Sequence, residues 1–361
     1  MVQTANLRSL LGVEHPIIQA PMAGGATTPE LVAAVSNAGG LGTLGAAYLT
    51  PAQIADAVAA TRRLTDRPFG VNLFAGGVEP ADRADLAPML AILARYHEAL
   101  GLPPPSLPEQ AALPFEAQFD AVLAAGVPVF SFTFGIPGPD ALAKLKAGGT
   151  VVLGTATTVA EARRLDAAGV DAVVAQGSEA GAHRGTFDGP FEAALIGTLA
   201  LVPQVADAVS VPIVAAGGIM DGRGIVSARA LGAAGVQLGT AFLTCHESGI
   251  PAAYKAAVRA ARDDQTALTR AFSGRLARGI VNDFLRDLRQ QEAAILPYPL
   301  QNALTRPLRA AAAARGDTRY LSLWAGQAAA LARDLPAGEL VRQLLHEAAV
   351  VRAHLADDAG W

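Results

Sequence analysis

The chain of 361 residues is 52% apolar and carries a formal net charge of −4. This apolar content supplies a sizeable buried core, which excludes an intrinsically disordered chain. Lysines and arginines are scattered along the sequence, so the basic stripe that nucleic-acid phosphates require is absent and we expect no nucleic-acid partner.

Cysteine content and hydropathy indicate the compartment. The one cysteine, Cys245, cannot form an internal disulfide, and no Cys/His spacing typical of a metal site occurs in the sequence. The sequence contains no signal-peptide pattern and no uncharged apolar stretch of about 18 residues. We therefore expect a cytoplasmic protein with no metal and no membrane partner.

Short apolar runs alternate with Ala-rich segments along the first two thirds of the chain. The runs predict strands at 17–20, 41–44, 69–73, 128–134, 150–155, 171–176, 212–216 and 235–240. The segments between them predict helices at 29–39, 51–64, 114–125, 138–147, 158–168, 191–208 and 222–233. This alternation predicts an α/β fold, a (β/α)8 TIM barrel. A doubly wound open sheet is the rival, because apolar runs do not report closure.

Two regions depart from the repeating unit. Residues 76–113 combine a charged helix with the proline-rich run GLPPPSLPEQ, and we interpret them as an insertion after the third strand. Residues 246–325 are richer in Arg, Asp and Gln and are predicted to form a helical cap, or substrate domain, over the barrel mouth. The expected division is a barrel over 1–245, this cap, and C-terminal helices over 326–361 that pack back on the barrel.

Glycines follow the seventh and eighth predicted strands, in AAGGIMDGRG and QLGTAF. Both runs offer free backbone N–H groups, and the first leads into a helix N-terminus that would suit an anion. The loops after these two strands are the usual phosphate site of a (β/α)8 barrel. The sequence therefore predicts phosphate binding around Gly218 and Gly239, with ordinary tight turns as the alternative.

Polar and exposed groups also follow other strands. Asn72 and Gln176 are neutral amides that could hydrogen-bond a heterocyclic ring with both donor and acceptor edges. The alternative is that each amide satisfies neighbouring backbone. Met22, in the run APMAGG after the first strand, could lie against a flat ring or fill the core.

Of six histidines, only His183 falls on a glycine-rich loop that follows a predicted strand, in VVAQGSEAGAHRGTF. A histidine at a barrel mouth can accept a proton near neutral pH, as general base catalysis requires, although a lone histidine can also be structural. Glu179, the nearest acid, could face solvent or cap a turn. No G-x-S-x-G elbow occurs, and no lysine lies near a predicted strand end, which favours a bound cofactor as the reactive group.

Taken together, several motifs resemble the nitronate monooxygenase family, formerly called 2-nitropropane dioxygenases, and its class I branch. They run from residue 16 to about 327 and are PIIQAPMAGGATTPELVAAVSNAGGLGTLG, GVNLF, VVAQGSEAGAHRGTF, PIVAAGGIMDGRGIVSARALGAAGVQLGTAFL and YPLQN. The resemblance implies an enzyme with non-covalently bound FMN. Its implied reaction is oxidation of alkyl nitronates, such as propionate 3-nitronate, by O2 to a carbonyl compound and nitrite without NAD(P)H.

The resemblance also implies roles for individual residues. The family's catalytic histidine matches His183, and Tyr298 and Trp324 match aromatic residues near the substrate entrance. His183 could remove the α-proton of a nitroalkane or, when protonated, hold the negative nitro oxygens. The FMN-binding positions of the family match Met22, Asn72, Gln176, Gly181, Gly218, Gln237, Leu238, Gly239 and Thr240.

Other functions stay open at this point. An NAD(P)H-dependent FMN reductase of quinones or enoyl thioesters would share the flavin motifs, whereas the H-R-G segment with YPLQN and LWAGQ favours the monooxygenase. A flavin-free isomerase or lyase would bind a sugar phosphate through Gly218 and Gly239. The sequence alone identifies neither the oligomeric state nor the physiological nitronate.

Overall fold

Eight parallel strands form the centre of the computed structural model, which describes residues 6–76 and 85–357. Their order is β1-β9-β8-β6-β5-β4-β3-β2, and a parallel bridge from Ile18 to Leu41 brings β1 back to the start of β2. The predicted (β/α)8 barrel is therefore confirmed, and the alternative of an open sheet is excluded. The strands are β1 Ile17–Gln19, β2 Gly42–Gly45, β3 Phe69–Phe74, β4 Val129–Thr133, β5 Val151–Ala156, β6 Ala172–Gln176, β8 Ile213–Ala216 and β9 Gly235–Leu238.

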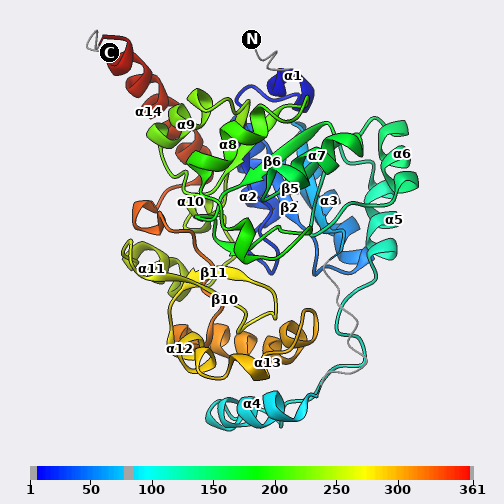
Figure 1. Cartoon of the computed structure of the whole chain (residues 1–361), viewed down its shortest axis with the longest axis vertical. Helices are drawn as coiled ribbons and strands as arrows, with labels where there is room; N and C mark the ends of the chain where they lie inside the picture. Colours follow the sequence, from blue (N-terminus) through cyan, green and yellow to red (C-terminus); the bar gives the residue numbers. More distant parts are fainter. Residues whose placement is uncertain (1–5, 77–84, 358–361) are drawn as a thin grey trace.

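Helices surround this barrel (Figure 1). Threonine side chains cap three of them at the N-terminus: Thr28 accepts from the Leu31 N–H, and Thr50 and Thr158 each form a capping box with the residue three positions later. A further short helix, α1 Leu7–Leu11, packs its leucines on the apolar side chains inside the barrel. The surrounding helices are α2 Pro29–Asn37, α3 Pro51–Leu64, α5 Phe115–Ala125, α6 Pro139–Ala147, α7 Val159–Ala167, α8 Thr198–Ala206 and α9 Gly222–Ala230.

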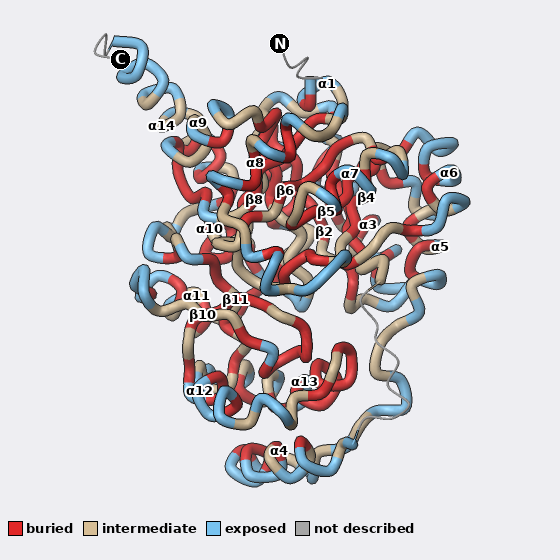
Figure 2. The backbone as a smooth tube through the Cα atoms, viewed as in Figure 1, coloured by how far each residue is buried: buried red, intermediate tan, exposed pale blue. Residues whose placement is uncertain are grey.

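Strand side chains alternate between two apolar layers. In β6, Val173 packs outward in the layer shared with the helices, whereas Val174 belongs to the cluster inside the barrel. Figure 2 shows the buried backbone concentrated on these strands. Each fully buried Val or Leu contributes roughly 1.5–3 kcal/mol of burial free energy, so this continuous core fixes the strand ends where the site lies.

The predicted helix over 191–208 is wrong in its first half. The structure has a 3-10 turn, η1 Glu192–Ala194, and α8 begins only at Thr198. The cause is Glu179, whose carboxylate accepts hydrogen bonds from the Thr198 backbone N–H and hydroxyl, each at 2.9 Å. Of the two roles expected for Glu179, the structure confirms the capping role.

The insertion after β3 lies against the cap. It supplies α4 Ala87–Ala99, while its residues 77–84 lie outside the described part of the chain. Met89 and Leu93 of α4 share one buried cluster with Phe284 and Leu304. In Figure 1, α4 lies beside α13 (Leu300–Arg315), at the end of the molecule away from the barrel. The insertion therefore contributes to the core of the cap.

The cap is not only helical, which corrects the sequence-based expectation. Alongside α11 Ala252–Ala260, α12 Asp283–Arg289 and α13 it contains the antiparallel strands β10 Thr266–Thr269 and β11 Ala277–Ile280. The two-residue strand β7 Ala182–His183, from the loop after β6, pairs with β11. These strands are too short to show an apolar alternation. Because β7 pairs across it, the domain division at residue 245 stays a prediction.

The last part of the chain returns to the barrel helices. It contains η4 Ala329–Leu331 and α14 Ala337–Asp357, whereas the short element α10 Thr240–Leu243 follows β9, and η2 Glu292–Ala294 and η3 Thr318–Tyr320 belong to the cap. Helix α14 packs against α9 and α2. Within it, Glu347 pairs with Arg333 at 2.7 Å and accepts a hydrogen bond from the Gly222 N–H at 3.1 Å. The final turns of α14 extend past the barrel (Figure 1).

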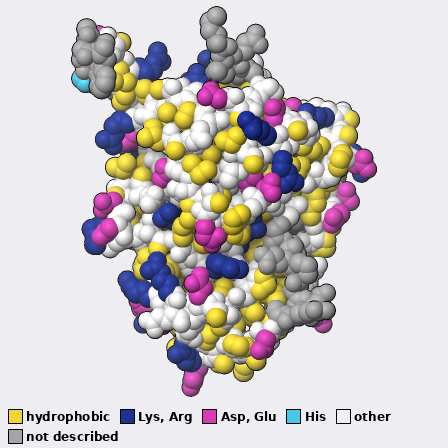
Figure 3. All heavy atoms as spheres, viewed as in Figure 1, with side chains coloured by type: hydrophobic (Ala, Val, Ile, Leu, Met, Phe, Trp, Pro, Cys, Tyr) yellow, Lys and Arg dark blue, Asp and Glu magenta, His cyan; other side chains and the backbone are white. Residues whose placement is uncertain are grey.

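Charged side chains of both signs are interspersed on the face of the molecule shown in Figure 3, and no area of a single sign dominates it. Within residues 6–76 and 85–357, no helix is long and apolar enough to cross a membrane. The same residues contain no group of three or more His, Cys, Asp or Glu side chains that could hold a metal ion.

A buried carboxylate anchors the loop that continues from β7. Glu161, which is 0% exposed, accepts hydrogen bonds from the Thr157 N–H at 2.6 Å and hydroxyl at 2.7 Å. It also accepts from the backbone N–H groups of Phe187 and of Asp188, the latter at 2.9 Å. Glu161 thus ties the loop after His183 to the start of α7.

We predict that Glu161→Gln lowers the free energy of unfolding by about 3 kcal/mol, because an amide NH2 would face buried N–H groups that need an acceptor. Urea denaturation measures this change. The exposed Glu192→Gln is the matched control and should change stability by less than about 0.5 kcal/mol. Equal stability of the two variants would show that the anchor contributes nothing.

Candidate active site

A cavity of about 530 Å³ opens at the carboxyl ends of the barrel strands, between the barrel and the cap. Its walls come from the loops after the barrel strands, from α13 and from residues 321–328. This is the position at which barrels of this type place their chemistry. The structure brings ten of the sequence-predicted site residues to its walls: Met22, Asn72, Gln176, Gly181, His183, Gly218, Gln237, Gly239, Thr240 and Trp324.

Two predicted site residues do not line this cavity. The Leu238 side chain is buried in the layer between strands and helices. Tyr298 is also buried, with its ring centroid 6.4 Å from that of His183. Its hydroxyl is hydrogen-bonded to that of Tyr48, which does line the cavity. Tyr298 therefore lies behind the wall and supports His183 and Tyr48.

The glycine loops after β8 and β9 expose backbone to the cavity. Gly218 adopts φ +72°, a conformation that favours glycine. A Cβ built on Gly239 would meet nothing nearer than 3.6 Å, so a ligand has room to approach that backbone. Thr240 Oγ1 accepts a hydrogen bond from the Gly326 N–H at 2.9 Å, which brings the cap segment against the same loop.

The expected anion site at the helix after strand seven is wrong. The first N–H groups of α9 are taken by carboxylates of the protein itself. Asp221 accepts from the Arg223 N–H at 2.9 Å and the Gly224 N–H at 3.2 Å, while Glu347 accepts from the Gly222 N–H at 3.1 Å. Any phosphate at this end of the cavity would contact the Gly218 and Gly239–Thr240 backbone instead.

The side-chain amides of Asn72 and Gln176 differ in which hydrogen-bonding groups remain available to a ligand. Asn72 Nδ2 donates to Ser131 Oγ at 2.9 Å, and no hydrogen bond within the described residues uses Asn72 Oδ1. Gln176 uses both ends, since Nε2 donates to the His183 carbonyl at 3.1 Å and Oε1 accepts from the Gly185 N–H at 2.8 Å. Gln176 therefore orients the histidine loop and retains one N–H for a ligand.

The backbone and neighbouring rings fix the orientation of His183. In the β7–β11 pairing, His183 lies opposite Ala277. The preceding Ala182 has φ +60°, which is uncommon for a residue other than glycine. His183 Nε2 lies 2.8 Å from Ser273 Oγ. Aromatic rings approach the imidazole with centroid distances from 5.6 to 6.4 Å; they belong to Phe74, Phe134, Tyr298 and Trp324.

The imidazole of His183 is electrically neutral in this environment. Burial, together with the positive charges of Arg275 and Arg309, lowers its pKa from the usual 6.5 to about 3. Of the two roles left open by the sequence, a neutral imidazole suits proton acceptance and not the holding of nitro oxygens as an imidazolium.

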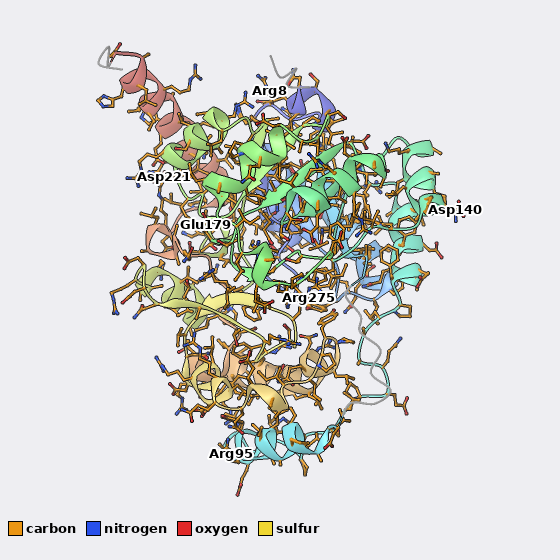
Figure 4. All side chains as sticks on the ribbon, viewed as in Figure 1. Arg8, Arg95, Asp140, Glu179, Asp221 and Arg275 are labelled. Atoms are coloured by element: carbon orange, nitrogen blue, oxygen red, sulfur yellow. The ribbon has the colours of Figure 1, made fainter. Side chains whose placement is uncertain are left out.

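Buried arginines hold the loops around His183. Arg184, which is 0% exposed, donates to the Gln176 carbonyl at 2.9 Å and the Ala194 carbonyl at 3.2 Å. Arg275 donates to the Thr186 carbonyl and lies where the barrel meets the cap (Figure 4). Most of these acceptors are neutral carbonyls and do not cancel the guanidinium charges. The positive charges therefore also raise the electrostatic potential in the cavity.

Sequence reasoning missed the residues on the cap side of the cavity. Asn302, Arg306 and Arg309 of α13 line it together with Tyr48. Arg309 Nη2 donates to Asn302 Oδ1 at 2.7 Å, and burial lowers the pKa of Arg309 to about 10. Among the described residues, no carboxylate forms an ion pair with Arg306 or Arg309. In the sequence, these residues could have been noticed as two arginines three positions apart, and so on one face, in the alanine-rich helix QNALTRPLRAAAA.

Comparison with known proteins agrees with this geometry. The family model described as "Nitronate monooxygenase" matches residues 5–347. A "Probable nitronate monooxygenase" of Staphylococcus aureus (strain Newman) is 45% identical over 342 residues, covering 94% of this chain and 96% of that protein. The solved structure of nitroalkane oxidase from Streptomyces ansochromogenes superposes with a TM-score of 0.89 at 44% identity, covering 97% of this chain and 100% of the other.

A second solved structure, FabK from Thermotoga maritima, has a TM-score of 0.78 at 32% identity and covers 99% of both chains. The shared barrel is therefore found beyond the nitroalkane oxidase. The family match also extends over barrel and cap together and includes His183 and the cap segment from 321 to 328. This chain belongs to the nitronate monooxygenase family.

Proposed function

We propose that this chain is an FMN-dependent enzyme that oxidises alkyl nitronates with O2 to a carbonyl compound and nitrite. The observation that carries the proposal is that the neutral imidazole of His183 lines the same cavity as the Gly218 and Gly239 backbone. Membership of a flavin-dependent family supports it.

The groups around the cavity fit FMN. The open backbone at Gly218, Gly239 and Thr240 would hold the phosphate, as loops after the last two strands do in such barrels. Asn72 Oδ1 and the remaining N–H of Gln176 would hydrogen-bond the polar edge of the ring. Met22, Gly181 and Gln237 would form further walls, and Leu238 could contribute only its backbone. When bound, FMN would accept electrons from the substrate.

His183 would act as the base toward a neutral nitroalkane. Its uncharged imidazole would take the α-proton and leave the substrate as a nitronate. A nitronate supplied as such needs no proton removal. Trp324, on the cavity wall, and Tyr298, behind it, would exclude water from this side of the imidazole.

The arginines of α13 support substrates that carry a second negative group. Arg306 and Arg309 place two guanidinium groups at the cavity, and their partners within the described residues are neutral. Arg306 is exposed and Arg309 is half-buried, and a planar guanidinium can form paired, charge-assisted hydrogen bonds with a carboxylate, which favours an anionic ligand at this position. Propionate 3-nitronate, with its carboxylate, has the chemistry that this side of the cavity would bind.

Anaerobic mixing tests the reaction class. We expect the flavin absorbance of the holoenzyme to bleach with propionate 3-nitronate and to stay unchanged with NADPH. Admission of O2 should then consume oxygen and release nitrite. Rapid bleaching by NADPH together with inertness toward nitronates would instead support the NAD(P)H-dependent reductase.

We expect His183→Asn to retain flavin absorbance and to lower turnover of neutral nitroethane by a factor of about 10² to 10⁴, the range for loss of a general base. Steady-state oxygen consumption measures the turnover. His246→Asn is the matched control, because His246 is exposed and lies outside the cavity wall, and its turnover should match that of the unaltered enzyme. Unchanged turnover in His183→Asn would remove His183 from the mechanism.

Arg306 would set the choice between nitronates with and without a carboxylate. Arg306→Gln should raise the KM for propionate 3-nitronate by about 10- to 100-fold, the range for losing one charge-assisted hydrogen bond, because the carboxylate loses a cationic partner. The KM for ethyl nitronate, which has no carboxylate, should change by less than about 3-fold. Arg163→Gln, an exposed change on α7, controls for loss of net charge. Equal changes for both substrates would contradict a carboxylate contact.

A further inference from the structure

The hydroxyl of Ser273 is buried next to His183 and has three polar partners. Ser273 is 1% exposed, and its Oγ lies 2.8 Å from His183 Nε2. The same Oγ donates to the Arg275 carbonyl at 3.1 Å and accepts from the Arg275 N–H at 3.3 Å. All three contacts meet at one oxygen atom that is closed to solvent.

The bonding capacity of a hydroxyl fixes the direction of each contact. A serine Oγ has one proton to donate and two lone pairs to accept with. The Arg275 carbonyl can only accept, so it takes the Ser273 proton, and the Arg275 N–H can only donate, so it uses one lone pair. One lone pair is left for His183, and Nε2 must therefore carry a proton and donate it.

The opposite tautomer would leave these groups poorly matched. If Nε2 carried no proton, Ser273 would have to donate to it and would withdraw its proton from the Arg275 carbonyl. Buried polar groups are costly to leave without their hydrogen bonds. The arrangement thus favours the Nε2–H form, with the lone pair on Nδ1.

The turn that carries Ser273 is closely packed, which keeps the hydroxyl in place. Gly274 has φ +83°, and a Cβ built on it would lie 2.3 Å from the Leu296 carbonyl oxygen. Arg270 Nε donates to the Gly274 carbonyl at 2.9 Å. The turn leads directly into β11, whose pairing with β7 holds the His183 backbone. Serine and histidine are therefore held on adjoining parts of one small sheet.

We propose that Ser273 is a positioning residue that holds His183 as the Nε2–H tautomer, so that Nδ1 is the atom that takes the substrate's α-proton. The proposal rests on the proposed role of His183 as the base. In this step the α C–H bond breaks, its electron pair stays on the substrate as the nitronate, and the proton forms a bond to Nδ1. Nε2–H remains bonded to Ser273 throughout.

Nitrogen NMR of the holoenzyme labelled with ¹⁵N-histidine reads the tautomer directly. His183 signals are assigned by their loss in His183→Asn. We expect a protonated Nε2 and an unprotonated Nδ1 in the unaltered enzyme. In Ser273→Ala, where the acceptor is gone, we expect a mixture of both tautomers. A protonated Nδ1 in the unaltered enzyme would overturn the proposal, whether or not nitronates prove to be substrates.

Kinetics separate positioning from a merely structural role. Ser273→Ala should lower kcat for neutral nitroethane by about 10- to 100-fold, because proton removal needs Nδ1 free. With ethyl nitronate, which needs no proton removal, kcat should stay within about 3-fold. Ser273→Thr, which keeps the hydroxyl, should restore the nitroethane rate, and the exposed Ser227→Ala is the matched control. Equal losses on both substrates would contradict the proposal.

Discussion

The site depends on the pairing of two short strands, β7 Ala182–His183 and β11 Ala277–Ile280, across the boundary between barrel and cap. The barrel alone holds His183 through the Gln176 side chain, which donates to its carbonyl at 3.1 Å. The cap adds the backbone pairing and the Ser273 hydroxyl at 2.8 Å from Nε2. Because both parts position one side chain, a displacement of the cap relative to the barrel would also move the imidazole.

Positive charge at the cavity shapes the protonation of the site. Arg275 and Arg309 act on His183 in addition to burial, so its pKa lies near 3 and its ring is uncharged at neutral pH. The same charges would lower the free energy of any anion that enters the cavity. One electrostatic arrangement would therefore serve two purposes under the proposed function: it would attract anionic ligands and keep His183 free of a proton until substrate arrives.

The barrel and its strand ends could be predicted from the sequence because both follow local rules. Buried strands such as β6 are apolar runs, and His183 was found because it follows one of them. Ser273, Tyr48 and Arg309 could not be found in this way. Ser273 is separated from His183 by 90 residues and meets it only through the β7–β11 pairing. The anion site expected at α9 failed for a partly local reason, since the N-cap Asp221 occupies two N–H groups of that helix end and only the third is taken by a distant residue, Glu347.

The division of labour between barrel and cap suggests how such enzymes come to differ. The barrel loops offer backbone at Gly218 and Gly239 and an amide at Asn72, groups that suit a cofactor but cannot distinguish one oxidisable substrate from another. FabK from Thermotoga maritima, at 32% identity, shares this architecture over 99% of both chains. Substrate choice must then depend on side chains that do not come from the ends of the barrel strands. In this chain those side chains come from α13 and from the turn before β11, so changes in the cap can redirect the chemistry while the barrel stays the same.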